Sequence, residues 1–299
     1  MKYTIDSEYA KSNFIIEGTT LVNYIGEPEP EELYIPDGIE TLAFGCLSAI
    51  NKLNSLHIPP SLKYTDESLF SEIEFTKELP FPKNVYIENL ENYLKIEAVD
   101  KNASVNDDGE VISICPFCFG YDSSLFLNGS LVKTLFIPAD MTIIPCGAFA
   151  EYLSIKNVVF PPQLMEIGDL AFSFCKDIEK ITLPDTITKI GEYAFRFTGL
   201  CELILPPRLS IIAEDCFRGC EKLTRVVLNE SLFEIRKRAF EGCFALFEIT
   251  IPKNVVYVDE YCFDNCTNLK TIYIHGDKKR VKQWNKKWKS GCKAKVKFI

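Results

Sequence analysis

The stretch Ile181–Phe195, ITLPDTITKIGEYAF, decides the fold because it returns along the chain about every 23 residues. Its last residue belongs to one column, made up of Phe149, Phe172, Phe195, Phe217, Phe240 and Phe263. The residue that ends its first apolar run belongs to a second column with the same intervals, made up of Pro138, Pro161, Pro184, Pro206, Asn229, Pro252 and His275. Two columns with one period indicate a solenoid of stacked repeats.

Each repeat predicts one short strand followed by one tight helical turn. The alternation Ile181-x-Leu183 is typical of a strand with one buried face, and Pro184 ends the pairing because proline has no backbone N–H. Gly191 is expected to allow a bend, and the helical turn at Ala194-Phe195 is expected to bring the phenylalanine to the centre of the coil. A single repeat cannot bury these side chains, so stability is expected to come from stacking.

This phrase resembles the BspA-like leucine-rich repeat of bacteria and protists, with close matches over residues 181–204 and 249–272. The resemblance covers at least half of the chain. It implies a leucine-rich-repeat solenoid, a curved right-handed superhelix with a parallel β-sheet on its concave face and short helical turns on its convex side. It also implies a non-enzymatic protein-binding role of the adhesion or scaffold kind, often at a cell surface.

The spacing divides the chain into five segments. We predict an N-terminal hairpin cap and acidic linker over 1–32, degenerate repeats ending in a strand-helix module over 33–97, a loop and hairpin insert with one degenerate repeat over 98–134, regular repeats over 135–275, and a basic C-terminal cap over 276–299.

Local signals add detail to the first half of the chain. Pro36, Pro59 and Pro82 are 23 residues apart and are expected to end three strands. A strand at 85–87 and a helix within 88–96 are expected to close this first block, and a matching strand and helix at 272–289 to close the second. Asn128-Gly129 predicts the two-residue turn of a hairpin over 125–131.

The net charge of −9 is unevenly distributed. Residues 277–299 carry ten Lys and Arg and one Asp, which is +9 and leaves −18 for residues 1–276. An acidic body argues against nucleic acid on the main surface. Between Met1 and Gly18 no apolar run is long enough for a signal peptide or a membrane span, which indicates a cytoplasmic protein. A leader removed from the sequence would instead make the protein secreted or exposed at the cell surface.

The twelve cysteines follow the repeat columns. Cys175, Cys220, Cys243 and Cys266 share a column with Thr198, and Cys118, Cys216 and Cys262 share the column of Ala148, Ala171, Ala194 and Ala239. Small buried residues are therefore expected, with metal or redox use as the alternative.

No chemistry-bearing motif is complete. Cys115 and Cys118 have C-x-x-C spacing but lack a βαβ setting and a second ligand pair. Asp100-x-Asn102-x-Ser104 begins like a calcium loop, but Val105 stands where that loop needs glycine. We therefore predict no catalytic residue, no metal site and no cofactor.

The basic tail has two interpretations. Val281, Trp284 and Trp288 are spaced to share one face of a helix over 278–289. In the first interpretation they cap the last repeat, and a final strand follows at 295–299. In the alternative, the tail is an amphipathic segment that makes the chain an adaptor for nucleic acid or an anionic membrane.

The candidate partner-binding residues are those expected to point outward from the concave face. They are Phe136, Val159, Lys180, Thr182, Glu202, Ile204, Arg225, Val227, Glu248, Thr250 and Tyr273. An apolar stripe beside mixed charges suits a protein partner, although β-branched residues also suit any strand. We predict protein–protein interaction through this face, with nucleic acid and membrane binding as the alternative. An enzyme with its site between Pro82 and Pro138 lacks a nucleophile and base pair.

Overall fold

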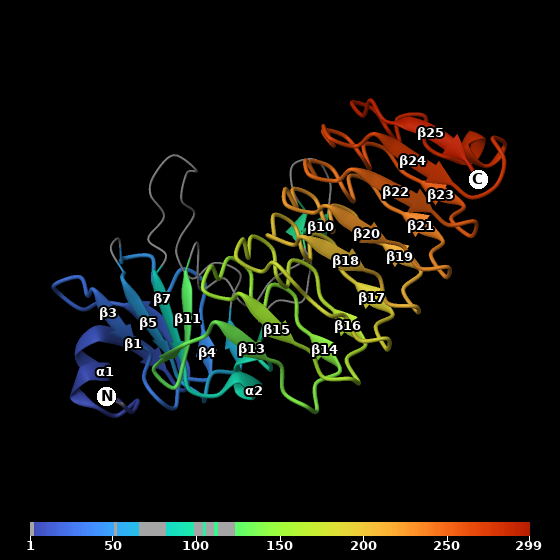
Figure 1. The fold of residues 1–299 in the computed structure, drawn as a ribbon. Coiled ribbons are helices and arrows are strands. Elements are labelled where there is room, and N and C mark those ends of the chain that lie inside the picture. The colour runs from blue at the N-terminus through green and yellow to red at the C-terminus, as the bar shows by residue number, and fades with distance from the viewer. Residues whose placement is uncertain (1–2, 51–52, 66–81, 99–103, 106–110, 113–122) are drawn as a thin grey trace. The chain divides into compact units, whose positions relative to one another are not determined.

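The computed structural model describes residues 3–50, 53–65, 82–98, 104–105, 111–112 and 123–299, and its strands are short and mostly parallel (Figure 1). The predicted repeat solenoid is the fold. The chain forms two compact units: unit 1 comprises residues 1–132 and 146–154, and unit 2 comprises residues 133–145 and 155–299. None of the helices in the described residues is long and apolar enough to cross a membrane.

Unit 1 contains two main sheets, ordered β1-β2-β4-β6-β8 and β12-β11-β7-β5-β3, and a separate pair of β9 and β10. Its elements are α1 (Glu8–Asn13), β1 (Phe14–Glu17), β2 (Thr20–Tyr24), β3 (Glu32–Tyr34), β4 (Thr41–Leu42), β5 (Ser55–Ile58), β6 (Tyr64–Thr65), β7 (Asn84–Ile87), α2 (Leu90–Tyr93), β8 (Glu97–Ala98), β9 (Ser104–Val105), β10 (Val111–Ile112), β11 (Ser124–Leu127) and β12 (Ser130–Leu131).

Both predicted hairpins of unit 1 are present. β1 pairs with β2 and β11 with β12, each antiparallel. Asn128 and Gly129 have φ values of 50° and 75°, the left-handed pair that a tight two-residue turn requires. Helix α1 precedes the first hairpin and was not predicted; the Ser7 hydroxyl caps it by accepting from the Ala10 N–H at 3.2 Å.

One prediction for the first block is wrong, and another lies outside the described residues. The strand expected to end at Pro82 would fall within residues 66–81, which the structure does not describe, and the next strand, β7, begins at Asn84. β7 also pairs with β5 on one side and β11 on the other, so the strand-helix module lies inside the sheet and does not close it. The antiparallel β12 ends that sheet. The predicted helix is the single turn α2, and its Tyr93 hydroxyl donates to the Ala148 carbonyl at 3.1 Å.

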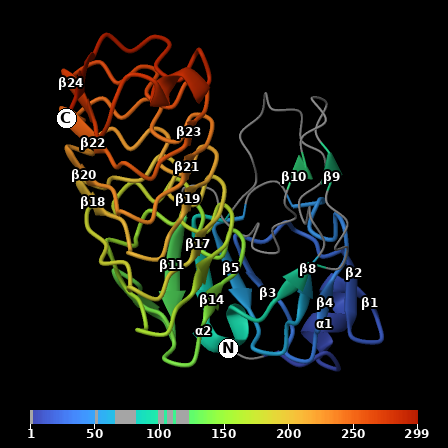
Figure 2. The same ribbon diagram turned by 90° about the vertical axis from the view of Figure 1, so that its right-hand side faces the viewer.

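Most coils of unit 2 contain two short parallel strands instead of the one that the sequence predicted. The strand predicted at Ile181–Leu183 is absent, and that coil forms only an isolated bridge between Lys180 and Asn157. The strands form two series, each divided into separate sheets of two or three strands. We call the first series the front sheet: β13 (Thr134–Phe136), β15 (Asn157–Val159), β18 (Glu202–Ile204), β20 (Arg225–Val227), β22 (Glu248–Ile251), β24 (Thr271–Ile274) and β25 (Lys295–Phe298). We call the second series the back sheet: β14 (Ile143–Ile144), β16 (Glu166–Ile167), β17 (Lys189–Ile190), β19 (Ile211–Ile212), β21 (Glu234–Ile235) and β23 (Tyr257–Val258). Figure 2 shows the two series as separate stacks.

The phenylalanine column forms the core of unit 2. Phe195 and Phe217 are fully buried, and their ring centroids lie 5.7 Å apart at an interplanar angle of 4°. The next pair, Phe217 and Phe240, is also separated by 5.7 Å. Each ring therefore contacts a ring in the coil before it and in the coil after it, as stacking requires.

The predicted helical turn at Ala194-Phe195 is a hydrogen-bonded turn and not a helix. Tyr193 and Phe197 have φ values of 58° and 54°, and left-handed residues on both sides prevent a helix from propagating. The Phe195 N–H instead donates to the Cys216 carbonyl of the next coil at 2.9 Å. The turns thus join neighbouring coils through the backbone.

Gly191 is needed for a reason other than the predicted bend. A β-carbon at Gly191 would lie 2.5 Å from the backbone nitrogen of Asp169 in the preceding coil. This contact is too short for any side chain, so the close approach of two coils requires glycine here.

The basic tail forms one more coil and not the predicted helix over 278–289. Only η1 (Arg280–Gln283) is helical, and it is a 3-10 turn. Trp288 is buried edge-on against Phe263, with ring centroids 6.1 Å apart. β25 then pairs in parallel with β24, as the predicted final strand. The tryptophans therefore cover the end of the core, as the capping interpretation expects.

Several predictions lie outside the described residues. They concern the degenerate repeat and loop expected within 98–134, most of which is not described, the C-x-x-C pair Cys115 and Cys118, and the calcium-like residues Asp100 and Asn102.

Candidate binding surfaces

The front sheet of unit 2 brings the predicted partner-binding residues into register on one face. Phe136 lies opposite Val159, and Ile204 lies opposite Val227, on adjacent parallel strands. All four side chains are exposed; Phe136 and Ile204 are 66% and 60% accessible. Large apolar groups at this exposure on successive strands form a stripe that is open to solvent.

A charged column runs beside this apolar stripe. Glu202 lies opposite Arg225 in the register of β18 and β20, and Lys180 and Glu248 extend the column in both directions. All four are exposed, as are Thr182 and Thr250. Tyr273 differs because it is half-buried, with the Lys297 ammonium 5.4 Å from its ring centroid. The front face therefore combines exposed apolar area with charges of both signs.

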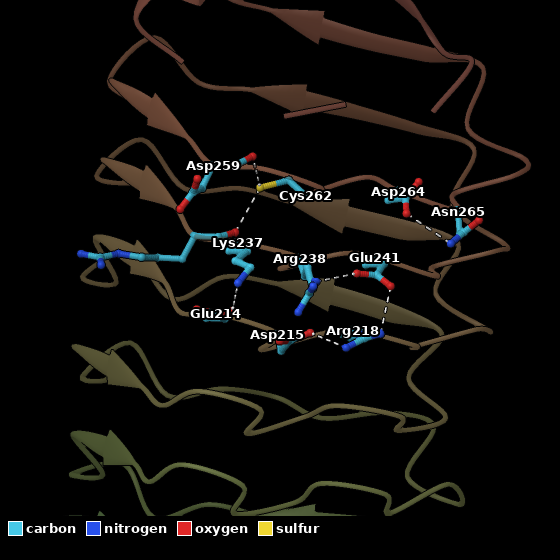
Figure 3. Close-up of polar contacts among 11 residues, drawn as sticks. Glu214, Asp215, Arg218, Lys237, Arg238, Glu241, Asp259, Cys262, Asp264 and Asn265 are labelled. Carbon is cyan, nitrogen blue, oxygen red and sulfur yellow. Dashed lines mark hydrogen bonds and ion pairs between the residues drawn. The ribbon is translucent and has the colours of Figure 1, made fainter. Parts of the chain in front are cut away.

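A cluster of charged side chains lies in the turns of unit 2, as the close-up view shows (Figure 3). Arg218 bridges Asp215 at 3.3 Å and Glu241 at 3.0 Å, and Arg238 contacts Glu241 at 3.3 Å. Burial raises the pKa of the Asp215 carboxyl, and the Arg218 guanidinium opposes this shift. The Arg218 guanidinium therefore joins carboxylates of two neighbouring coils, while Asp215 Oδ2 is buried with no hydrogen-bond partner among the described residues.

Cys220, Cys243 and Cys266 of unit 2 are buried as predicted, and their thiols are poor nucleophiles. The thiols of Cys220, Cys243 and Cys266 each donate to the carbonyl of a phenylalanine in the preceding coil, at 3.1–3.3 Å. Burial raises the pKa of Cys220 to about 11 and that of Cys266 to about 12. A thiol that stays protonated near neutral pH is a weak nucleophile and a weak metal ligand. The thiols of seven cysteines are free, namely Cys201, Cys216, Cys220, Cys243, Cys262, Cys266 and Cys292, and no group of three metal-ligating side chains lies among the described residues.

Unit 1 presents a second surface that the sequence analysis missed. Tyr34, His57, Tyr86 and Phe126 stand in one register on β3, β5, β7 and β11. Their rings stack with centroid distances of 3.9, 4.3 and 4.5 Å. We call this row the aromatic ladder.

Part of the ladder was visible in the sequence. Tyr34 and His57 each stand two residues before a proline, as Phe136 does before Pro138. The column could therefore have been extended toward the N-terminus. Tyr86 and Phe126 have no such proline after them, and an irregular spacing separates them from His57, so periodicity could not reveal them.

The stacked parallel coils of short strands define a protein of the leucine-rich-repeat class. The model of the family described as "BspA type Leucine rich repeat region" matches six copies of the repeat, over residues 27–125, 121–217 and 198–287. The chain therefore belongs to this family.

One solved structure agrees with this fold, and a second is reported with it as a similar chain. A leucine-rich repeat protein from Eubacterium ventriosum is 14% identical, with a TM-score of 0.51 over 92% of this chain and 89% of that chain. A leucine rich cell surface protein from Faecalibacterium prausnitzii is 16% identical, with a TM-score of 0.38 over 100% of this chain and 94% of that chain. No curated protein matches.

Proposed function

We propose that this chain is a non-enzymatic binding protein that holds a protein partner against the front-sheet face of unit 2. The observation that carries the proposal is the solvent-exposed apolar stripe whose most exposed members are Phe136 and Ile204. Exposed aromatic and aliphatic side chains that stand in register supply the apolar centre of an interface. The flanking charges of Glu202 and Arg225 supply its polar rim and select the orientation of the partner.

The charged side chains and the thiols described for unit 2 favour a binding role over catalysis. The polar cluster around Arg218 and Glu241 is internally paired, and the thiols described above are held protonated by burial. The membership of the chain in a repeat family with exposed strand faces points the same way.

Site-specific photo-crosslinking tests the proposal. A benzoylphenylalanine placed at Ile204 is expected to capture a partner of defined mass in an extract of the source cells. The matched control carries the same probe at Phe244, which is 40% exposed and lies outside the front sheet. Equal crosslinking from both positions would contradict a role for the front face.

The captured protein then allows a measurement of affinity. The double variant Phe136→Ser/Ile204→Ser is expected to weaken binding by at least about tenfold, because it removes two anchors from the centre of the interface. The control Phe233→Ser/Phe244→Ser removes two other exposed apolar side chains and should leave the affinity unchanged. Full retention of affinity in the first variant would rule out the stripe as the binding surface.

A further inference from the structure

The aromatic ladder of unit 1 forms the floor of a groove of about 580 Å³. Tyr34, His57 and Tyr86 line it together with Tyr3 from the N-terminal segment. The hairpin turn between β11 and β12 contributes Asn128 and Gly129. This volume lies in the range of sites for small molecules and short peptide segments.

Two carboxylates, those of Asp37 and Glu88, line the groove, and its lining within the described residues contains no Lys or Arg. The backbone N–H of Asp37 donates to the Tyr3 carbonyl at 2.6 Å, and its carbonyl accepts from the Ile5 N–H at 3.1 Å. These two bonds fix the position of Asp37 at the groove.

The whole of unit 1 adds to this negative potential. Its sequence contains 23 Asp and Glu against eight Lys and Arg, a net charge of −15, whereas unit 2 carries +6 of the total of −9. A concave surface within a body of one sign concentrates the field and attracts ligands of the opposite charge. The groove therefore suits a cation.

The ladder geometry decides which kind of ligand fits best. Both faces of the His57 ring are covered, by Tyr34 at 3.9 Å and by Tyr86 at 4.3 Å. Tyr86 is covered in the same way by His57 and Phe126. A sugar ring that stacks on an aromatic face finds neither face open at these two residues. The ladder instead offers ring edges, and the C–H groups of these edges can contact an aliphatic stem.

We propose that this groove binds a basic segment of a partner polypeptide. The aliphatic stems of its Lys or Arg side chains lie across the edges of the ladder, and their cationic heads pair with the carboxylates of Asp37 and Glu88. Lys and Arg are the side chains that join a long apolar stem to a positive head. This site uses other residues than the front-sheet face and goes beyond the function proposed above.

Fluorescence anisotropy with a labelled, capped tetralysine peptide and the full chain tests this inference. We expect binding that weakens as salt rises from 50 to 300 mM. Asp37→Asn/Glu88→Gln should weaken it by about 25-fold, from about fivefold for each carboxylate. Glu88 is exposed, so Glu88→Gln alone keeps the test valid if the change at Asp37 disturbs folding.

Four controls distinguish this groove from the front sheet, from an uncharged peptide site and from a sugar site. Glu202→Gln/Glu248→Gln removes the same charge from the front sheet of unit 2 and should leave tetralysine binding unchanged, as should the front-face variant Phe136→Ser/Ile204→Ser. The capped peptide of four acetyl-lysines should not bind, and neither should cellohexaose. The inference is overturned if both acid-pair variants lose affinity equally, if the acetylated peptide binds as well as tetralysine, or if cellohexaose binds in place of tetralysine.

Discussion

The phenylalanine stack makes a quantitative prediction about Phe217. This side chain is fully buried, and its ring contacts Phe195 and Phe240, each at 5.7 Å. Phe217→Ala removes the apolar volume and leaves a cavity, at a cost of about 3–5 kcal/mol. Phe217→Leu keeps much of the volume and loses the two ring contacts, so we expect a cost of about 1–3 kcal/mol.

Native-state hydrogen exchange measures this cost locally, which suits a chain in which each coil depends mainly on its neighbours. A loss of about 3 kcal/mol corresponds to roughly 100-fold faster exchange of the amides around β19 and β21 in Phe217→Ala. Amides of β1 and β5 in unit 1 should keep their protection, because stability in a repeat array is a sum of local terms.

The matched control is Phe244→Ala. Phe244 lies on the same unit, is 40% exposed and has no place in the stack, so its loss should cost at most about 0.5 kcal/mol. The reasoning fails if Phe217→Ala costs less than about 1 kcal/mol. It also fails if the two alanine variants exchange at the same rate.

Three further predictions concern the cysteines, the aromatic ladder and the C-terminal coil. Cys220, whose pKa is raised to about 11 by burial, should react with a disulfide reagent at pH 8 only after unfolding; rapid reaction of the native chain would show that the coil opens. Burial lowers the pKa of His57 below 6.5, so the unfolded state binds more protons than the folded state as the pH falls through 6.5. Unit 1 should therefore lose stability on acidification. The urea midpoint should fall less between pH 7.5 and pH 5 in His57→Phe, which keeps an aromatic ring, than in the unchanged chain. Trp288→Ala uncovers Phe263 and should cost about 3–5 kcal/mol in the last coil, seen as faster exchange in β23 and β24 but not in β15.

The sequence predicted the features of unit 2 that recur with the repeat. The buried phenylalanines, the cysteine column and the outward positions of the front sheet all follow from a fixed interval, because a residue in one coil lies over its counterpart in the next. The back sheet was missed because each of its strands is two residues long, and alternation cannot be recognised in two residues.

Features that depend on contacts between coils could not be predicted from the interval of the repeat. Gly191 was expected to permit a bend, whereas it makes room for the backbone of Asp169. The groove of unit 1 was missed for a similar reason, since Asp37, Glu88 and Asn128 stand at irregular intervals and meet only when the strands of the ladder are aligned. The candidate site in unit 2 was predictable because it is periodic, and the one in unit 1 was hidden because it is not.

The two surfaces differ in a way that makes them separable in solution. The groove lies in a unit of net charge −15, so its attraction for a basic ligand should fall steeply as salt screens that field. The front face of unit 2 presents an apolar stripe bordered by Glu202 and Arg225, and burial of apolar area depends little on salt. Binding measured at low and high ionic strength should therefore assign a partner to one surface or the other, before any residue is changed.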